Sequence, residues 1–218
     1  MAEQEIVAFD LEGTLSAGVA WEGMRDYLVE HGEGAKFKRF VRQNFFRLLA
    51  FRVGIIRNER AFKERWILGI MRLFAGYTPE RFDEVANWVA DRSFWAHRRL
   101  PVVDELLAYQ EKGVRVVIVS GMFEPILQQF AEKLQVESIG TQIEVVNGRL
   151  TGEIIGQLNV GQPKVDKLQQ LPGKLVAAYG DTMRDIPMLE LAETAVAVHP
   201  DAILRETAVQ RGWRILTS

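Results

Sequence analysis

The stretch that decides the fold is "EIVAFDLEGTL", residues 5–15. An apolar run from Ile6 to Phe9 leads into two acids, Asp10 and Glu12, and then into a Gly-Thr turn. Strand packing gives no reason for paired carboxylates at the rim of a sheet, because their mutual repulsion makes ionisation unfavourable. Either these acids lie harmlessly in solvent, or a cation holds them together.

The composition is that of an ordinary globular protein. Of the 218 residues, 48% are hydrophobic and 26% are charged, and this length suffices for one well-buried domain or for a core with an insertion. The absence of cysteine excludes disulfides, thiolate metal sites and cysteine nucleophiles. The first residues lack the pattern of a signal peptide, and no uncharged apolar run approaches the roughly 20 residues of a membrane span. We therefore expect a cytoplasmic protein.

Charge is distributed unevenly along the chain, whose net charge is −2. Residues 35–75 contain eleven basic and two acidic side chains, so this segment carries +9 and the remainder −11. Such a basic run is most often a solvated helix face. Attraction of anionic substrates toward a site is the second interpretation, and peripheral contact with anionic lipid headgroups is the third. No nucleic-acid-binding motif accompanies the charge, so we expect no nucleic-acid partner.

Short apolar runs bounded by turn residues predict the strands of a sheet. They are residues 6–9, 114–119, 175–179, 195–198 and 213–216. Because these runs are apolar on both faces and alternate with helical patterns, they favour a doubly wound α/β fold with a parallel sheet. An Asn147-Gly148 turn flanked by β-rich residues also predicts a hairpin.

Residues 17–95 contain no such strand pattern. Apolar residues recur there at helical spacing, for example Phe37, Phe40 and Val41. Thr78 followed by Pro79 is typical of an N-cap and the first position of a helix. We therefore expect a helical cap domain at 17–95, inserted after the first strand, and an α/β core made of 1–16 and 96–218.

Polar residues follow the predicted strands at the places where a parallel sheet binds its ligands, beyond the carboxyl ends. They are Asp10, Glu12, Ser120, Gly121, Asp181 and Asp185, with Lys164 preceding the third of these strands. Carboxylates from separate strands repel one another unless a hard divalent cation binds them, and oxygen ligands suit Mg²⁺. A carboxylate beside Mg²⁺ can attack a phosphoryl group, while hydroxyl, ammonium and backbone N–H groups hold its oxygens.

These motifs, in this order, resemble those of the haloacid dehalogenase superfamily, in its phosphoserine-phosphatase-like branch. The insertion after the first strand resembles the helical cap of that branch, and "VVNGRLTGEIIG" before Lys164 resembles its hairpin and lysine. The resemblance covers nearly the whole chain. It implies a Rossmann-like core and a Mg²⁺-dependent hydrolysis of small phosphomonoesters through an aspartyl-phosphate.

The resemblance also implies roles for the acids. Asp10 would be the nucleophile and a Mg²⁺ ligand. Glu12 would protonate the leaving oxygen and then activate water, and its backbone carbonyl would also ligate Mg²⁺. Asp181 would complete the metal shell, and Asp185 would support that shell either directly or through a neighbour.

The phosphoryl group would be held by the other motif residues. Ser120 and the Gly121 amide would bind its oxygens, and Lys164 would neutralise both these oxygens and Asp10. Lys167 is the rival for the lysine role, and we favour Lys164 because its spacing to the following leucines fits the family pattern.

Three positions depart from the family pattern and bear on the activity. Glu12 stands where Asp is usual, which keeps an acid and favours hydrolysis but leaves open phosphate transfer to a small alcohol, as in phosphoserine–homoserine phosphotransferases. Arg184 stands where phosphoserine phosphatases carry Asn, and Val19 stands where they carry a substrate-binding Glu. Because Val19 cannot bind the substrate ammonium and the cap is basic and rich in aromatic residues, we expect a larger anionic or partly apolar phosphomonoester rather than phosphoserine. A non-catalytic protein that binds anionic surfaces is the alternative from another class. The sequence predicts no oligomeric state.

Overall fold

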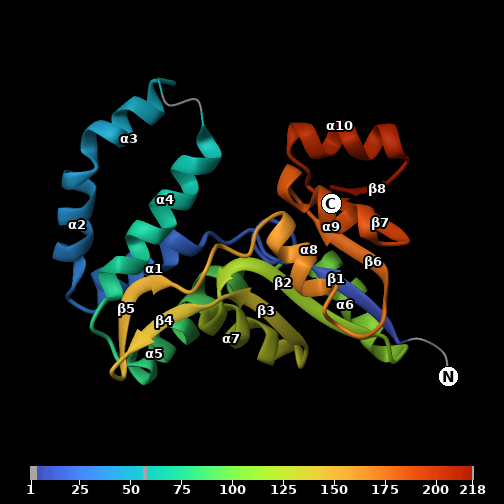
Figure 1. The fold of residues 1–218 in the computed structure, drawn as a ribbon, viewed down its shortest axis with the longest axis horizontal. Coiled ribbons are helices and arrows are strands. Elements are labelled where there is room, and N and C mark those ends of the chain that lie inside the picture. The colour runs from blue at the N-terminus through green and yellow to red at the C-terminus, as the bar shows by residue number, and fades with distance from the viewer. Residues whose placement is uncertain (1–3, 56–57, 218) are drawn as a thin grey trace.

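A parallel six-stranded sheet forms the centre of the computed structural model, which describes residues 4–55 and 58–217 (Figure 1). The strands run in the order β3-β2-β1-β6-β7-β8, and every neighbouring pair is parallel. They are β1 (Glu5–Phe9), β2 (Arg115–Phe123), β3 (Glu137–Thr141), β6 (Lys174–Gly180), β7 (Thr194–Val198) and β8 (Arg214–Leu216). The strand order reverses beside β1, as in doubly wound sheets. The predicted α/β fold class is confirmed.

Helices cover both faces of this sheet, and the alternation of strand residues explains why. Val7 and Phe9 face one apolar cluster, which includes α6 (Leu100–Glu111) and α7 (Glu124–Leu134). Ile6 and Ala8 face the other cluster, with α8 (Gln162–Leu168), α9 (Ile186–Leu191) and α10 (Ala202–Arg211). Because successive side chains of a strand point to opposite faces, a strand that is apolar at every position needs helices on both sides.

The sheet differs from the sequence prediction at two places. β3, with the sequence ESIGT, was not predicted, because polar residues and a glycine interrupt its apolar pattern at the edge of the sheet. The second strand continues to Phe123 instead of ending before Ser120, but its register against β3 shifts between Val119 and Phe123. Ser120 and Gly121 therefore lie in an irregular stretch of β2, where the regular ladder is interrupted.

The expected helical insertion is present after the first strand. It contains α1 (Ala20–Glu30), α2 (Gly34–Gln43), α3 (Phe45–Arg52), α4 (Glu59–Met71), α5 (Pro79–Val89) and the short helical turns Arg72–Phe74, Ala90–Phe94 and Trp95–His97. The Thr78 hydroxyl accepts a hydrogen bond from the Arg81 N–H at 3.3 Å, so Thr78 is the N-cap of α5 as predicted. The division into a core of 1–16 and 96–218 and a cap of 17–95 stays a prediction.

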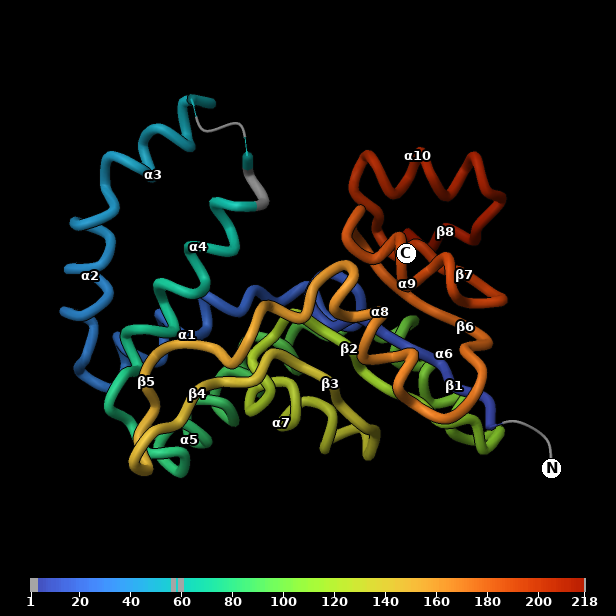
Figure 2. Tube along the Cα trace, viewed as in Figure 1, coloured from blue at the N-terminus to red at the C-terminus, as the bar shows by residue number. Residues whose placement is uncertain are grey.

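The insertion has a base and an arm. In the base, Met24 of α1 and Phe82 of α5 belong to the same apolar cluster as Phe9 of the central sheet. The arm, residues 34–71, consists of α2, α3 and α4 and extends away from the sheet (Figures 1 and 2). The base is thus continuous with the core, whereas the arm joins the same cluster through Phe40, Ile70 and Met71 and otherwise projects from it.

The predicted hairpin is formed by β4 (Ile143–Val146) and β5 (Arg149–Ile154). Its turn residues Asn147 and Gly148 have φ of 51° and 71°, as a type I′ turn requires. The hairpin packs on the insertion: Leu150 exchanges 2.8 Å backbone hydrogen bonds with Gly76 and Tyr77. A segment distant in sequence therefore extends the base of the insertion.

Candidate active site

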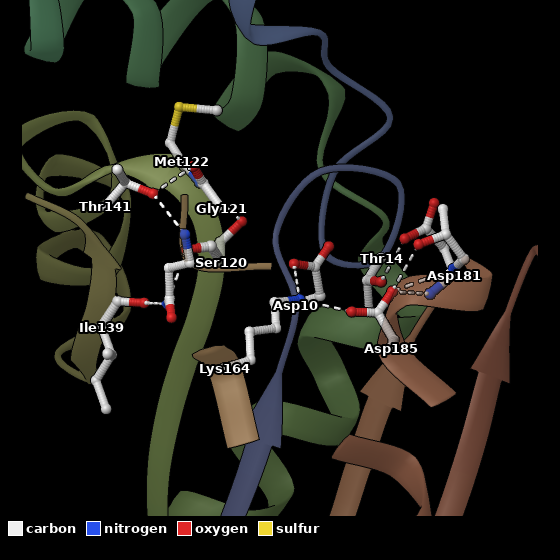
Figure 3. Close-up of polar contacts among 12 residues, drawn as sticks. Asp10, Thr14, Ser120, Gly121, Met122, Ile139, Thr141, Lys164, Asp181 and Asp185 are labelled. Carbon is white, nitrogen blue, oxygen red and sulfur yellow. Dashed lines mark hydrogen bonds and ion pairs between the residues drawn. The ribbon is translucent and has the colours of Figure 1, made fainter. Parts of the chain in front are cut away.

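The polar residues of the strand ends lie together at one edge of the sheet (Figure 3). Carboxylate oxygens of Asp10, Asp181 and Asp185 all lie within 4.8 Å of one another. Lys164 Nζ donates to Asp10 Oδ1 and to Asp185 Oδ1, each at 2.6 Å. Asp10, Lys164 and Asp185 are buried, and Asp181 is partly buried. The structure thus brings three of the four predicted acids and the favoured lysine into one cluster.

Lys164 is held as an ammonium ion in this buried position. It lies near the start of α8 and is 2% exposed. Burial alone would lower the pKa of Lys164, but the charges of Asp10 and Asp185 outweigh burial and raise that pKa. Lys167, its rival, donates instead to the Gly140 carbonyl oxygen at 2.7 Å. The lysine that faces the acids is therefore Lys164.

Asp185 is fixed in place through both of its carboxylate oxygens. Oδ1 accepts from Lys164, while Oδ2 accepts from the N–H groups of Asp181 and Thr182 at 3.3 and 3.1 Å and from the Thr182 hydroxyl at 3.1 Å. The backbone at Gly180 passes so close that an added Cβ would lie 2.4 Å from Asp185 Cβ. Asp185 is therefore oriented by its own loop and holds Lys164.

Asp181 packs instead against the turn that follows β1. Thr14 Oγ1 donates to Asp181 Oδ1 at 3.4 Å, and a Cβ on Gly13 would lie 1.9 Å from Asp181 Oδ2. Gly13 also has a φ of +93°, which side-chain-bearing residues rarely adopt. Glycine at this position therefore permits the close approach of the loop that carries Asp181 to the strand end that carries Asp10.

The cluster holds more negative than positive charge. Burial, followed by repulsion from Asp10 and Asp185, raises the pKa of Asp181 to about 9. Burial also raises the pKa of Asp10 to about 6, although Lys164 opposes this effect. A divalent cation would relieve the repulsion, and an all-oxygen donor set suits Mg²⁺. The acids present therefore fit a magnesium ion.

This excess charge gives a testable pH dependence in the metal-free protein. The pKa values of Asp10 and Asp181, about 6 and about 9, exceed the value near 3.9 of an Asp in the unfolded chain. Between these pH values the folded state therefore binds more protons than the unfolded state. The free energy of unfolding should therefore fall as pH rises from about 4 through about 9. We expect Asp181→Asn to raise the melting temperature at alkaline pH by about 2–8 °C and to flatten this dependence.

The measurement is thermal unfolding in chelator across this pH range, followed by addition of Mg²⁺. Mg²⁺ should raise the melting temperature of the unaltered protein more than that of Asp181→Asn, because ligand binding to the folded state stabilises it. Asp166→Asn, which changes an exposed acid of α8, is the matched control. An Asp181→Asn protein with the unaltered pH slope and the unaltered response to Mg²⁺ would contradict this electrostatic account.

Glu12 lies beside the acidic cluster but points toward the insertion. Its Oε2 accepts from the Ala20 N–H at 3.3 Å, in the first turn of α1. Burial raises the pKa of Glu12 to about 7 against the opposing effects of this N–H and of the charge on Lys63. A carboxyl group with this pKa can both donate and accept a proton near neutral pH.

Ser120 and Gly121 lie on the other side of Asp10. The Ser120 hydroxyl is buried, accepts from the Met122 N–H at 3.4 Å and lowers the pKa of Asp10 by hydrogen bonding. Asn159 donates through Nδ2 to the Ser120 and Ile139 carbonyl oxygens at 3.1 and 2.8 Å. This buried amide holds the irregular stretch of β2 in place. A Cβ on Gly121 would lie 2.4 Å from Val160 Cγ1, so a larger residue at this position would require Val160 to move.

The sequence reasoning did not identify several residues that build the site. Asn159 lies in a segment without a recognisable motif, and only the fold brings it to the end of β2. Thr14 was part of the quoted stretch but received no role. Arg184, noted as a departure, forms a 3.1 Å ion pair with Glu64 of α4. The loop that carries Asp181 is therefore tied to the arm.

Comparison with known proteins places the chain in a family. Residues 7–190 match the haloacid dehalogenase-like hydrolases. Over 143 residues, 62% of this chain, it is 32% identical to phosphoserine phosphatase SerB1 of Mycobacterium tuberculosis, of which the match covers 44%. Over 141 residues, 57% of this chain, it is 30% identical to histidinol-phosphatase of Neisseria meningitidis, of which the match covers 64%. The matches thus cover about half the length of these relatives.

A solved structure shows the same fold over the whole chain. The crystal structure of a protein with unknown function from Bordetella pertussis Tohama I aligns with a TM-score of 0.78 at 22% identity and covers 99% of both chains. The extensive family match, together with the acids at the strand ends, confirms the resemblance noted from the sequence. The chain belongs to the haloacid dehalogenase-like hydrolases, in the branch that resembles phosphoserine phosphatases.

Proposed function

We propose that the protein is a Mg²⁺-dependent phosphomonoesterase that forms a phosphoenzyme on Asp10. The observation that carries this proposal is the buried pairing of Asp10 with Lys164, beside a second carboxylate whose pKa is raised to about 9. Such a cluster keeps a nucleophilic carboxylate ionised and also attracts a cation. The phosphatase names of both relatives described above support the same activity.

We assign different roles to the acids around the metal. Asp10 and Asp181 are the side chains that would hold Mg²⁺, together with the Glu12 carbonyl oxygen. Both oxygens of Asp185 are already engaged by Lys164 and by its own loop, so we assign Asp185 the positioning of these groups rather than direct ligation. When bound, Mg²⁺ neutralises the phosphoryl oxygens and lets Asp10 approach them.

In the first step, Asp10 attacks phosphorus, and the bond from phosphorus to the ester oxygen breaks. Glu12 gives its proton to that departing oxygen, so an alcohol leaves. In the second step, the Glu12 carboxylate takes a proton from water, the water oxygen attacks phosphorus, and the bond to Asp10 breaks to release phosphate. Ser120, the Gly121 N–H and Lys164 hold the negative oxygens in both steps.

The arm supplies groups that suit a larger substrate than phosphoserine. The charge of Lys63 on α4 opposes the rise in the pKa of Glu12, and the ion pair of Arg184 with Glu64 joins α4 to the loop that carries Asp181. Trp21, partly buried at the start of α1, packs edge-to-face on another tryptophan with ring centroids 6.1 Å apart. We infer that the leaving group carries a further anionic or aromatic part that these side chains contact.

The role of Glu12 can be tested with two leaving groups. We expect Glu12→Gln to reduce kcat by about 10²–10⁴-fold for an alkyl phosphate, because the alcohol then leaves without a proton. With p-nitrophenyl phosphate the first step needs no acid, so the variant should release nitrophenol in a burst of about one equivalent and then turn over slowly. Stopped-flow absorbance measures this burst.

Glu12→Asp is the control for this experiment, because it keeps the acid while shortening the side chain. It should retain more activity than Glu12→Gln on both substrates. Equal losses in the two variants, or slow turnover of the aryl phosphate without a burst, would refute the proton-transfer role.

A panel of phosphomonoesters assayed with Mg²⁺ tests the activity and the substrate class together. We expect release of phosphate that depends on Mg²⁺ and is faster for aromatic or doubly anionic monoesters than for phosphoserine. Phosphoserine as the clear best substrate would overturn the substrate class alone. Phosphorylation of an added small alcohol at the expense of phosphate release would indicate a phosphotransferase, and no turnover of any monoester would refute the proposed function.

A further inference from the structure

We propose that the tip of the arm, residues 45–55, docks on an anionic lipid membrane. This surface lies outside the site described above, and the proposal does not depend on the chemistry of that site. It rests on exposed apolar side chains, an uninterrupted positive charge and the position of α3 in the fold.

Large apolar side chains of the tip are exposed in unusual density. Phe46 is 83% exposed, Ile55 74% and Val53 61%, and Phe45 and Leu49 are about half exposed at 52% and 46%. Helix α3 has no buried residue at all. Single exposed apolar residues are common on any protein, but a group of five within eleven residues marks an interaction surface. Packing inside the arm does not account for these side chains.

The charge around this apolar group is of one sign. Residues 34–55 contain six basic and no acidic side chains. Among them Lys38, Arg39, Arg42, Arg47 and Arg52 are exposed. The rest of the chain is acidic overall, so the positive charge is concentrated on the arm. A surface with bases around exposed aromatic and aliphatic side chains complements an anionic lipid–water interface.

A depression beside the tip combines the same two features. It has a volume of about 390 Å³ and is lined by Phe37, Val41 and Phe45 with Lys38 and Arg42. It lies between α2 and the start of α3, away from the acidic cluster. An acyl chain near its headgroup would meet an apolar floor and two cationic side chains there.

The shape and charge of the tip favour a membrane over a second copy of the chain. A symmetric dimer through this surface would place the same positive patch against itself, which is repulsive. The tip lies at the far end of a projecting arm (Figures 1 and 2), and a bilayer accepts a protruding apolar group without a complementary pocket. No helix in the described parts of the chain is long and apolar enough to cross a bilayer, so the expected contact is peripheral.

Vesicle co-sedimentation of the full chain tests the proposal. We expect binding to vesicles of phosphatidylcholine mixed with phosphatidylglycerol, weaker binding at high salt, and little binding to phosphatidylcholine alone. Arg47→Ala combined with Arg52→Ala should weaken binding roughly 25-fold, at about fivefold for each charge lost. Phe46→Ser should weaken it about tenfold or more, because this side chain would no longer enter the apolar region.

The control is Val209→Ser, which removes an apolar side chain of similar exposure, 69%, from α10. It should bind vesicles like the unaltered protein, and all variants should keep the unaltered circular dichroism spectrum and hydrolyse a soluble aryl phosphate at the unaltered rate. Equal binding to neutral and anionic vesicles, or undiminished binding by Phe46→Ser, would overturn the proposal. So would a dimer, detected by sedimentation velocity, that Phe46→Ser dissociates while vesicle binding persists.

Discussion

Replacing Lys164 with Met is expected to reduce kcat by about 10²–10³-fold and to destabilise the metal-free protein by about 3–5 kcal/mol. The physical reason is that Lys164 Nζ lies 2.6 Å from both Asp10 Oδ1 and Asp185 Oδ1, and its removal leaves two buried carboxylates unpaired. Met retains most of the length of the Lys side chain, so the losses of kcat and of stability would come from the missing charge and not from a cavity. Steady-state kinetics and chemical denaturation in chelator measure the two effects.

Lys167→Met is the matched control for this experiment. Lys167 lies one helical turn further along α8, is partly buried, and donates to the Gly140 carbonyl oxygen instead of the acids. Its replacement should leave kcat within a few-fold of the unaltered value. Similar losses in both variants would show that the charge of Lys164 has no specific role at Asp10.

Replacing Asp10 with Asn should reduce kcat by about 10⁴-fold or more, the largest effect of any single change that we consider. The amide is nearly isosteric but is a far weaker nucleophile and carries no charge for the cation. Stability should change in the opposite direction: burial raises the pKa of Asp10 to about 6, so removal of this charge should stabilise the metal-free protein above that pH. Kinetics and thermal unfolding of one preparation give both results.

Loss of activity together with gain of stability separates a catalytic role from a structural one. Replacing a residue that merely supports the fold would lower both the activity and the stability. Asp166→Asn again serves as the control, since it changes an exposed acid that should affect neither quantity. An Asp10→Asn protein that retains a substantial fraction of the unaltered kcat would contradict the role of Asp10 as the nucleophile.

The sequence was informative wherever a local pattern has one structural interpretation. Apolar runs predicted five of the six strands of the sheet, because a strand buried on both faces must be apolar at nearly every position. The Asn147-Gly148 turn predicted the hairpin, because both residues adopt positive φ readily. Strand ends in a parallel sheet share one edge, so acids that follow separate strands were expected to meet, and Asp10, Asp181 and Asp185 do so.

What the sequence could not supply depends on contacts between distant segments. β3 was missed because an edge strand needs fewer apolar residues than a central one. The contacts of Asn159 with the end of β2, and of Arg184 with Glu64 on the arm, join residues far apart in sequence. The separation of the insertion into a base and an arm also follows only from packing, because helical periodicity alone does not show which helices a sheet will cover.

The central claim is that Asp10 accepts the phosphoryl group, and trapping of the intermediate tests it most directly. Enzyme in Mg²⁺ is mixed with substrate, stopped in acid and reduced with borohydride, which converts an aspartyl-phosphate to homoserine. Peptide mass spectrometry then locates the modified residue. The account predicts homoserine at position 10, dependent on substrate and enriched in Glu12→Gln, whose second step is slow. Homoserine at another aspartate, or none at position 10 while substrate is being turned over, would contradict it.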